Sequence, residues 1–383
     1  TVAGKHGEGT QFAVKLGPYW DTKAHSYDVK ATPQTDYVSD ILPKIAALDR
    51  LKQYEAEQAA LAVHIAEVEN GTFEPAGKNP LVLADRFAAH LVEAGFATIT
   101  QARKFAIDLG FAIEAKGIEE ALELGVVKAA RTIVEANRGD PQGTFQALIT
   151  LYGRQPKLST RTSTSVREQA YSTPVPLAYL ASRLAEVTPG VSVYEPTAGN
   201  GALLIEANPA HTMANEINPE RAAALKEQGF DVLQEDATRL KPTKSAKAFD
   251  VVLANPPFGA VRENGESKLF NLADIQPGYQ THEVDHVIAL HALAAMKDNG
   301  RAVLILGGLN KLTTDRAKGY DGKAKREFFK VLYDRYNVTD HFTVAGELYE
   351  RQGAGWPVDV IVIDGRGKSA RRYPTLDVPR QIN

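Results

Sequence analysis

The chain has 383 residues, of which 44% are hydrophobic and 24% are charged, and its formal net charge is −3. This composition is typical of a globular protein long enough for two domains, and it leaves any contact with nucleic acid to local basic patches. The absence of cysteine excludes disulfides, thiolate zinc sites and a cysteine nucleophile, including the thiolate that commonly serves methylation of pyrimidines at C5. No apolar run approaches the ~20 residues of a membrane span and no signal-peptide pattern opens the chain, so we expect a cytoplasmic protein.

The first 155 residues are predicted to form a mostly helical N-terminal domain that serves recognition or acts as a scaffold. Apolar residues recur there at helical spacing, and glycines follow several of the segments, as is common at helix C-termini. The predicted helices span 37–69, 80–95, 99–109, 117–136 and 141–152. Residues 156–172 are rich in serine, threonine and arginine and are predicted to be a linker, although the same side chains could equally contact phosphates.

Strands and helices alternate from about residue 173 onward. Short apolar runs are predicted strands, at 191–195, 211–215, 231–235, 249–254, 301–307, 338–344 and 358–364. The predicted helices among them span 174–186, 201–207, 219–228, 283–297 and 323–335. This alternation predicts an α/β fold, a doubly wound Rossmann-like sheet with helices on both faces, at residues 173–370, followed by a tail at 371–383. In such a sheet, ligands bind at the carboxyl ends of the strands.

The predicted strand at 249–254 ends abruptly on Asn255, Pro256, Pro257 and Phe258. The prolines stop the strand because proline cannot donate to a ladder of hydrogen bonds. The stiff loop can hold one amide, one carbonyl and one aromatic ring in fixed relative positions, which suits a site that grips a planar amino-bearing group. An ordinary strand followed by a proline turn would show the same pattern. The interpretation as a binding site therefore depends on the motifs found earlier in the sequence.

The predicted strand at 191–195 runs into a turn of small residues and then into a helix. Ala198, Gly199 and Gly201 let a ligand approach the backbone, and the helix N-terminus beyond points free N–H groups at it. Leu204 stands where a G-x-G-x-x-G dinucleotide motif requires glycine, so the turn is built for something other than a pyrophosphate. Glu195, at the end of the strand, would face a cationic group such as an α-amino group, with a sulfonium nearby.

The next two predicted strands also end on acids. Glu216 follows Gly199 by 17 residues, close to the ~20-residue offset at which a carboxylate reaches ribose hydroxyls in such folds. Asp236, followed by Ala237, can accept a hydrogen bond from an adenine amino group. Each acid alone is more often a solvated surface carboxylate, but acids at the ends of successive strands after a glycine turn indicate a ligand site.

Together these residues resemble the adenine-N6 DNA methyltransferases that use S-adenosylmethionine. Residues 195–201 read Glu-Pro-Thr-Ala-Gly-Asn-Gly and are similar to the E-P-x-A-G-x-G cofactor turn of that family, and residues 255–258 are similar to its (D/N/S)-P-P-(Y/F) catalytic motif. The cofactor turn comes first, which resembles the gamma arrangement, and Ser172-Thr173-Pro174 stands where that arrangement has a Thr-Pro element. The resemblance covers roughly residues 168–366 and implies the class I methyltransferase fold.

The resemblance implies S-adenosylmethionine as the cofactor, with its methionine moiety bordered by Thr173, Glu195 and Ala198. It implies that Glu216 binds the ribose and that Asp236 with Ala237 holds the cofactor adenine. The further cofactor-binding candidates in these motifs are Pro196, Gly199, Gly201 and Ile217.

The resemblance also implies transfer of the methyl group to N6 of an adenine flipped out of DNA. Asn255 and the Pro256 carbonyl would accept hydrogen bonds from the target amine, and Pro257 would stiffen the loop. Phe258 would stack on the extruded base. Direct in-line transfer needs no covalent enzyme intermediate, which is consistent with the absence of cysteine.

The stretch from 311 to 330 contains seven basic residues and three acids. Because it follows a predicted strand at the ligand-bearing edge, we expect contacts with DNA phosphates, although a solvated loop and helix face would have the same composition. The candidates are Lys311, Arg316, Lys318, Lys323, Lys325 and Arg326. His282 and His286 lie four residues apart around Asp285, but without a third ligand or an H-E-x-x-H frame we predict no metal there and consider a role in lining the site.

Only a short tail follows the predicted sheet, whereas gamma-order enzymes usually carry a separate target-recognition domain at that end. The adenine could therefore be chosen by residues 1–155, by the insertion at 259–280, or with low specificity. The catalytic half also resembles methylase regions at the front of large phage and plasmid polypeptides that continue into helicase-like domains. That resemblance implies a phage-associated module cut from a longer anti-restriction protein. The alternatives are a methyltransferase acting on RNA or a protein glutamine, and a catalytically silent scaffold that binds cofactor or DNA.

Overall fold

The computed structural model describes residues 79–111, 114–157, 172–240, 247–263, 266–309, 315–352 and 355–382. The chain divides into two compact units, Thr1–Pro75 and Ala76–Asn383, and the described residues all lie in the second. The helix predicted at 37–69, most of the linker predicted at 156–172 and Lys311 lie outside the described residues. Among the described helices, none is both long enough and apolar enough to cross a membrane.

The described part of the chain begins with a group of helices. Their bounds are α2 (Pro80–Glu93), α3 (Ile99–Asp108), α4 (Ala115–Ala136) and α5 (Pro141–Arg154). Asn79, Thr98 and Asp140 cap three of them, because their side chains accept hydrogen bonds from backbone N–H groups of the first turn. Helix α4 packs closely on α2 at Gly125, where an added Cβ would lie only 2.9 Å from the carbonyl oxygen of Ala84. The four helices predicted between residues 80 and 152 are confirmed.

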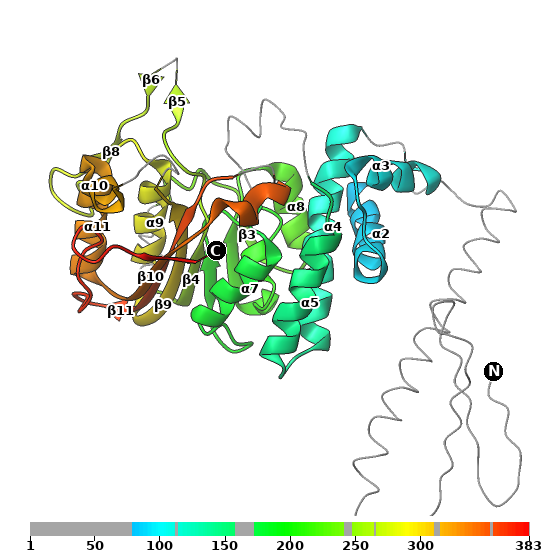
Figure 1. The fold of residues 1–383 in the computed structure, drawn as a ribbon, viewed down its shortest axis with the longest axis horizontal. Helices are drawn as coiled ribbons and strands as arrows, with labels where there is room; N and C mark the ends of the chain where they lie inside the picture. Colours follow the sequence, from blue (N-terminus) through cyan, green and yellow to red (C-terminus); the bar gives the residue numbers. More distant parts are fainter. Residues whose placement is uncertain are drawn as a thin grey trace, which may run out of the picture. The chain divides into compact units, whose positions relative to one another are not determined.

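Eight strands form one sheet in the order β12-β10-β11-β9-β4-β1-β2-β3 (Figure 1). Their bounds are β1 (Val193–Glu195), β2 (Thr212–Asn215), β3 (Asp231–Leu233), β4 (Phe249–Ala254), β9 (Met296–Gly307), β10 (Tyr336–Val344), β11 (Val358–Arg366) and β12 (Arg380–Ile382). All neighbouring strands are parallel except β11, which runs antiparallel to both β9 and β10. The carboxyl ends of β1 to β4 therefore meet at one edge of the sheet.

Helices cover both faces of the sheet, because successive residues of a strand point to opposite sides. Val251 and Leu253 of β4 pack into a core shared with α2 to α5 and α7 (Val175–Leu184). Val252 and Ala254 pack into a second core, shared with α9 (Val284–Ala294) and α11 (Lys323–Arg335). Helix α8 (Pro219–Glu227) joins β2 to β3. The predicted doubly wound α/β fold is confirmed.

The structure corrects three predicted elements. The helix predicted at 201–207 is a short 3-10 turn, η1 (Ala202–Leu204). Strand β9 begins at Met296, inside the predicted helix 283–297, because α9 ends at Ala294. The guanidinium of Arg366 donates hydrogen bonds to backbone carbonyls at that junction. The predicted tail contains β12, which pairs with β10 and so extends the sheet.

The connections contain shorter elements. The insertion predicted at 259–280 forms two small hairpins, β5 (Arg262–Glu263) with β6 (Glu266–Ser267) and β7 (Phe270–Asn271) with β8 (Gln280–Thr281). The remaining elements are η2 (Pro209–His211), α10 (Arg316–Asp321) and η3 (Gly346–Gln352). Both hairpins lie between β4 and α9 in the chain, so they follow directly on the Asn-Pro-Pro-Phe loop.

Candidate active site

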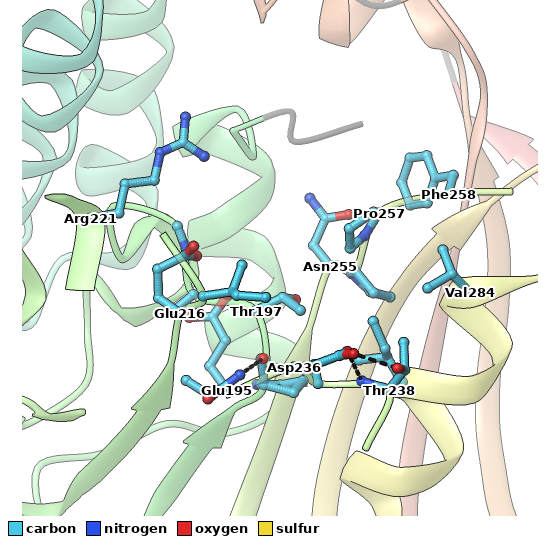
Figure 2. Close-up of a pocket in the computed structure, with 18 of the residues that line it drawn as sticks. Glu195, Thr197, Glu216, Arg221, Asp236, Thr238, Asn255, Pro257, Phe258 and Val284 are labelled. Atoms are coloured by element: carbon cyan, nitrogen blue, oxygen red, sulfur yellow. Dashed lines mark hydrogen bonds between the residues drawn. The ribbon is translucent and has the colours of Figure 1, made fainter. Parts of the chain in front are cut away.

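A cavity of about 510 Å³ lies at the carboxyl ends of β1 to β4 (Figure 2). Nearly all of the predicted cofactor-binding and catalytic residues line it: Thr173, Glu195, Pro196, Ala198, Gly199, Glu216, Ile217, Asp236, Ala237, Asn255, Pro256, Pro257 and Phe258. These residues come from separate strand ends, which parallel pairing brings to one edge. Gly201 is the predicted residue that does not line the cavity.

Two glycines in the left-handed region shape the turn after β1. Gly199 has a φ of 57° and Gly201 a φ of 89°, which L side chains rarely adopt. A Cβ at Gly199 would meet no atom within 4 Å, so this residue faces open space in the cavity. A Cβ at Gly201 would lie 3.1 Å from Leu225 Cδ2, so Gly201 allows packing against α8 rather than the approach of a ligand.

Glu195 ends β1 and is only 2% exposed. Its Oε2 atom has no hydrogen-bond partner in the part of the chain that the structure describes. Burial, together with the negative charge of Glu216, raises the pKa of Glu195 well above its ordinary value. A buried carboxyl with an unpaired oxygen is unfavourable, and a cation or N–H donor entering the cavity would relieve that cost.

Glu216 and Asp236 are held in place by nearby donors. Glu216 accepts hydrogen bonds from the N–H groups of Gly199, at 2.8 Å, and Asn218, at 2.7 Å, which ties the glycine turn to β2. Asp236 Oδ1 accepts from the N–H of Thr238 at 2.9 Å and from its hydroxyl at 2.7 Å (Figure 2). Each carboxylate oxygen has more than one acceptor position, so both acids retain capacity for a ribose hydroxyl or an adenine amine.

Asn255 follows directly on β4, and a hydrogen bond holds the nitrogen atom of its side-chain amide. Nδ2 donates a hydrogen bond to Thr173 Oγ1 at 2.7 Å. The Oδ1 atom is buried and has no partner among the described residues. Two prolines lead from Asn255 to Phe258. The Phe258 side chain lies against Gly307 of β9, where an added Cβ would be 3.4 Å from Phe258 Cβ. The loop therefore places an unpaired amide oxygen near an aromatic ring (Figure 2).

Residues 223–317 match the family model described as N-6 DNA methylase. This segment is similar to the N-6 DNA methylases. The match includes the Asn-Pro-Pro-Phe loop and β9. Thr173, the glycine turn and Glu216 precede the matched segment, and their place at the cavity comes from the geometry.

Solved structures match the chain at low similarity. A protein named as the modification subunit of a type I restriction enzyme from Vibrio vulnificus YJ016 has 15% identity and a TM-score of 0.42, with 66% of this chain and 58% of that chain covered. A chain from a type I R-M system has 14% identity and a TM-score of 0.41, with 75% of this chain and 61% of that chain covered. A protein named as a class I S-adenosylmethionine-dependent methyltransferase from Listeria monocytogenes has 12% identity and a TM-score of 0.38, with 79% and 91% covered. The chain thus spans less than two thirds of the two type I proteins. No curated protein matches it.

The cavity has one cationic side chain in its described lining, Arg221 of α8, which no local sequence pattern indicates. Its Nε and Nη2 donate to the two carboxylate oxygens of Glu120 on α4, both at 2.9 Å. Glu123, nearly one turn further along α4, lies 3.6 Å from Nη2 and accepts a hydrogen bond from the Ser172 hydroxyl at 2.6 Å. Helix α4 therefore supports the wall of the cavity. Sequence reasoning missed this pairing because 101 residues separate Arg221 from Glu120.

Asp285 and His286 are buried on α9 but do not line the cavity. His286 stacks on Phe328 with ring centroids 4.0 Å apart, and burial lowers the pKa of His286 well below its ordinary value. Asp285 accepts from the Gly307 N–H at 3.2 Å, and burial raises the pKa of Asp285 to about 6. His282 is exposed. Within the described ranges, no three histidine, aspartate or glutamate side chains are gathered as a metal site requires.

The predicted phosphate contacts fall into two groups. Arg316 and Lys325 are half-buried and bonded within the protein, to the Thr343 hydroxyl at 2.7 Å and to the Gly307 carbonyl at 2.6 Å. The exposed cations are Lys318, Lys323 and Arg326. The first group supports the packing of α10 and α11. The second group is exposed, and Arg326 within it also pairs with Asp321 at 3.4 Å.

Proposed function

We propose that the chain transfers a methyl group from S-adenosylmethionine to the N6 amine of adenine in DNA. The observation that carries this proposal is the unpaired amide oxygen of Asn255, which lies at the same cavity as the unpaired carboxyl oxygen of Glu195. The amide oxygen of Asn255 is an acceptor suited to a neutral amine, and the carboxyl of Glu195 is an acid suited to a cationic group. A cofactor with ammonium and sulfonium groups and a base with an exocyclic amine meet both requirements.

The cavity residues fit this cofactor by charge and by space. Glu195 would hold its cationic amino-acid end, Glu216 its ribose hydroxyls and Asp236 its adenine amine, with Ala237 against the ring. The orphaned oxygen of Glu195 and the open space at Gly199 support the fit. When bound, S-adenosylmethionine supplies an electrophilic methyl group on its sulfonium.

Asn255 and Pro256 would activate the target amine. The N6 lone pair of adenine is delocalised into the ring, so the free amine is a weak nucleophile. Asn255 Oδ1 and the Pro256 carbonyl would accept its two N–H groups and favour a tetrahedral amine whose lone pair points into the cavity, an interaction strongest in the transition state. Phe258 would stack on the base after it rotates out of the duplex, a contact worth roughly 1 to 3 kcal/mol.

Methyl transfer from radiolabelled S-adenosylmethionine tests the proposal. We expect label in duplex DNA, recovered as N6-methyladenine by mass spectrometry of the nucleosides, and none in a duplex whose adenines are already methylated. Label confined to RNA or to protein glutamine would favour the second hypothesis, because an Asn-Pro-Pro loop with an aromatic also suits other planar amino groups. Bound cofactor without transfer to any substrate would favour a silent scaffold.

The same proposal extends to the rest of the chain. We assign residues 1–155 to recognition or scaffold and 173–370 to catalysis, and the packing of α2 to α5 on the core of the sheet supports a scaffold role for that part. A place in a larger phage or plasmid anti-restriction polypeptide rests on the sequence resemblance alone, whereas the expected cytoplasmic location rests on the apolar pattern of the sequence. Sequencing DNA from cells that express the protein, read for modified adenines, would give its recognition site, or show that it has none.

A further inference from the structure

Arg221 is the single cation in the described lining of a cavity whose other ionisable members are acids. Those acids are Glu195, Glu216, Glu235 and Asp236. S-Adenosylmethionine carries two cationic centres, the ammonium and the sulfonium, and one anion, the carboxylate of its amino-acid end. Charge complementarity assigns the cationic centres to the acids and leaves the carboxylate for Arg221. We propose that Arg221 binds the cofactor carboxylate and that Glu120 positions Arg221 for this contact; both statements rest on the proposed use of S-adenosylmethionine.

The guanidinium of Arg221 is oriented by α4 and keeps donors for a ligand. Glu120 takes one hydrogen bond from Nε and one from Nη2, and this two-point contact fixes the plane of the guanidinium. A guanidinium has five N–H donors, and the two on Nη1 make no hydrogen bond to the described residues. The side chain is 12% exposed and lines the cavity. Arg221 also lines a neighbouring cavity together with Glu120, and its Nη1 donors are free for an anion bound beside it.

Short links connect Arg221 to the proposed reaction centre. Glu123 lies 3.6 Å from Arg221 Nη2 and accepts the hydrogen bond from Ser172. The next residue, Thr173, accepts the hydrogen bond from Asn255. The sulfonium must lie near Asn255 for transfer, so this side of the cavity is where the amino-acid end of the cofactor would extend.

The opposite side of the cavity suits the adenine. Figure 2 shows Glu216, the proposed ribose contact, between Arg221 and Asp236, the proposed adenine contact. Ribose likewise lies between the adenine and the amino-acid end in the cofactor itself.

The carboxyls beside Arg221 leave it able to attract an anion. Burial raises the pKa of Glu123, with the charge of Arg221 opposing that rise, so Glu123 gives up its proton less readily than an exposed glutamate. The negative charges of Glu123 and Glu120 both favour the charged form of Arg221 and raise its pKa. An arginine paired with one carboxylate can still donate charge-assisted hydrogen bonds from Nη1 to a second one.

Decarboxylated S-adenosylmethionine is the matched probe, because it keeps the sulfonium, the ammonium and the adenosine but lacks the carboxylate. In calorimetric titrations of the full chain, Arg221→Gln should weaken binding of S-adenosylmethionine by about tenfold or more and binding of the decarboxylated probe by less than about threefold. Glu120→Gln loosens the guanidinium and should give a smaller reduction in affinity with the same selectivity. Arg221→Lys keeps the charge and provides the same comparison if the glutamine variant does not fold.

Arg131→Gln is the control, since Arg131 is a part-buried arginine of α4 that donates to the carbonyls of Leu204 and Ala207, outside the cavity lining. It should change the affinity for both ligands by the same factor. An equal reduction in affinity for the two ligands in Arg221→Gln would overturn the carboxylate assignment and leave cofactor use intact. Failure of the wild-type chain to bind either ligand would overturn the proposed cofactor and, with it, the role of Arg221.

Discussion

The two sides of the cavity are built from different chemistry. The proposed cofactor side consists of acids at the ends of β1, β2 and β3, and Glu195 among them has a strongly raised pKa. The proposed substrate side consists of Asn255, two prolines and Phe258, none of which ionises. Cofactor affinity should therefore depend on pH, whereas methyl transfer should depend on the placement of neutral groups. Substitutions on the two sides should separate binding from transfer.

Asn255→Ala removes the amide oxygen of the substrate side and should have the largest effect. Removing one oriented group that stabilises a transition state lowers the rate by about 10²- to 10³-fold. Single-turnover methylation should slow by about this factor, while the cofactor Kd from calorimetry should stay within about twofold of wild type. Asn255→Asp keeps acceptor oxygens and should retain more activity. Unchanged turnover in Asn255→Ala would contradict the proposed role of the amide.

Phe258→Ala removes the ring on which the flipped base would stack. Stacking of a base on an aromatic side chain contributes ~1 to 3 kcal/mol, so KM for DNA should rise about 5- to 150-fold. Phe258→Tyr keeps the ring face and is the control. The fluorescence of 2-aminopurine at the target position reports base flipping and should increase less in the alanine variant than in wild type. An unchanged KM would mean that the ring serves packing on β9 and not the substrate.

The elements that local patterns specify lie where the sequence predicts them. Strand β4 and helix α11 have the predicted bounds, Phe249–Ala254 and Lys323–Arg335, because an apolar run stopped by prolines and an amphipathic period are both properties of neighbouring residues. The convergence of strand ends on one cavity also follows, since parallel strands share an edge. These local patterns, together with the family resemblance, were sufficient to predict about half of the residues that line the cavity.

The elements that depend on distant partners could not be predicted in the same way. Residues 296–300 of β9 are mostly polar, and their place depends on Gly300, where an added Cβ would lie 2.9 Å from the carbonyl oxygen of Asp250 on β4. Strand β12 forms against β10, with Arg380 opposite Phe342. The contact of Arg221 with α4 is of the same kind. Each of these requires the tertiary structure before its partner is known.

Glu195→Gln tests the cofactor side through pH. A carboxyl whose pKa is raised by folding holds its proton more tightly in the folded state than in the unfolded state. Its contribution to the free energy of unfolding is therefore present below its ordinary pKa of 4.5 and is lost as the pH rises through the raised value. Denaturant unfolding of the cofactor-free protein at a series of pH values should show this decrease, and Glu195→Gln should remove it.

Cofactor affinity should change with pH in the opposite direction to stability. The ionised Glu195 carboxylate attracts the cationic end of the cofactor, so affinity should rise as the pH rises through the raised pKa of Glu195. At pH 8, Glu195→Gln should weaken binding about tenfold, while transfer at saturating cofactor should fall less than about threefold. A larger effect on transfer than on binding would contradict the division between the two sides.

The exposed cations of α10 and α11 test how far the substrate side extends beyond the cavity, and they should give the smallest effect. Each substitution that removes a phosphate contact should lower the slope of log Kd against log salt concentration by about one, without changing base preference. Lys318→Gln and Lys323→Gln should each show this change in fluorescence anisotropy titrations with duplex DNA. Lys104→Gln is the control, because Lys104 is also exposed but lies on α3, paired with Asp108. If neither variant differs from wild type or from the control, DNA does not bind along these helices, and the contacts that choose the adenine must be sought elsewhere than on α10 and α11.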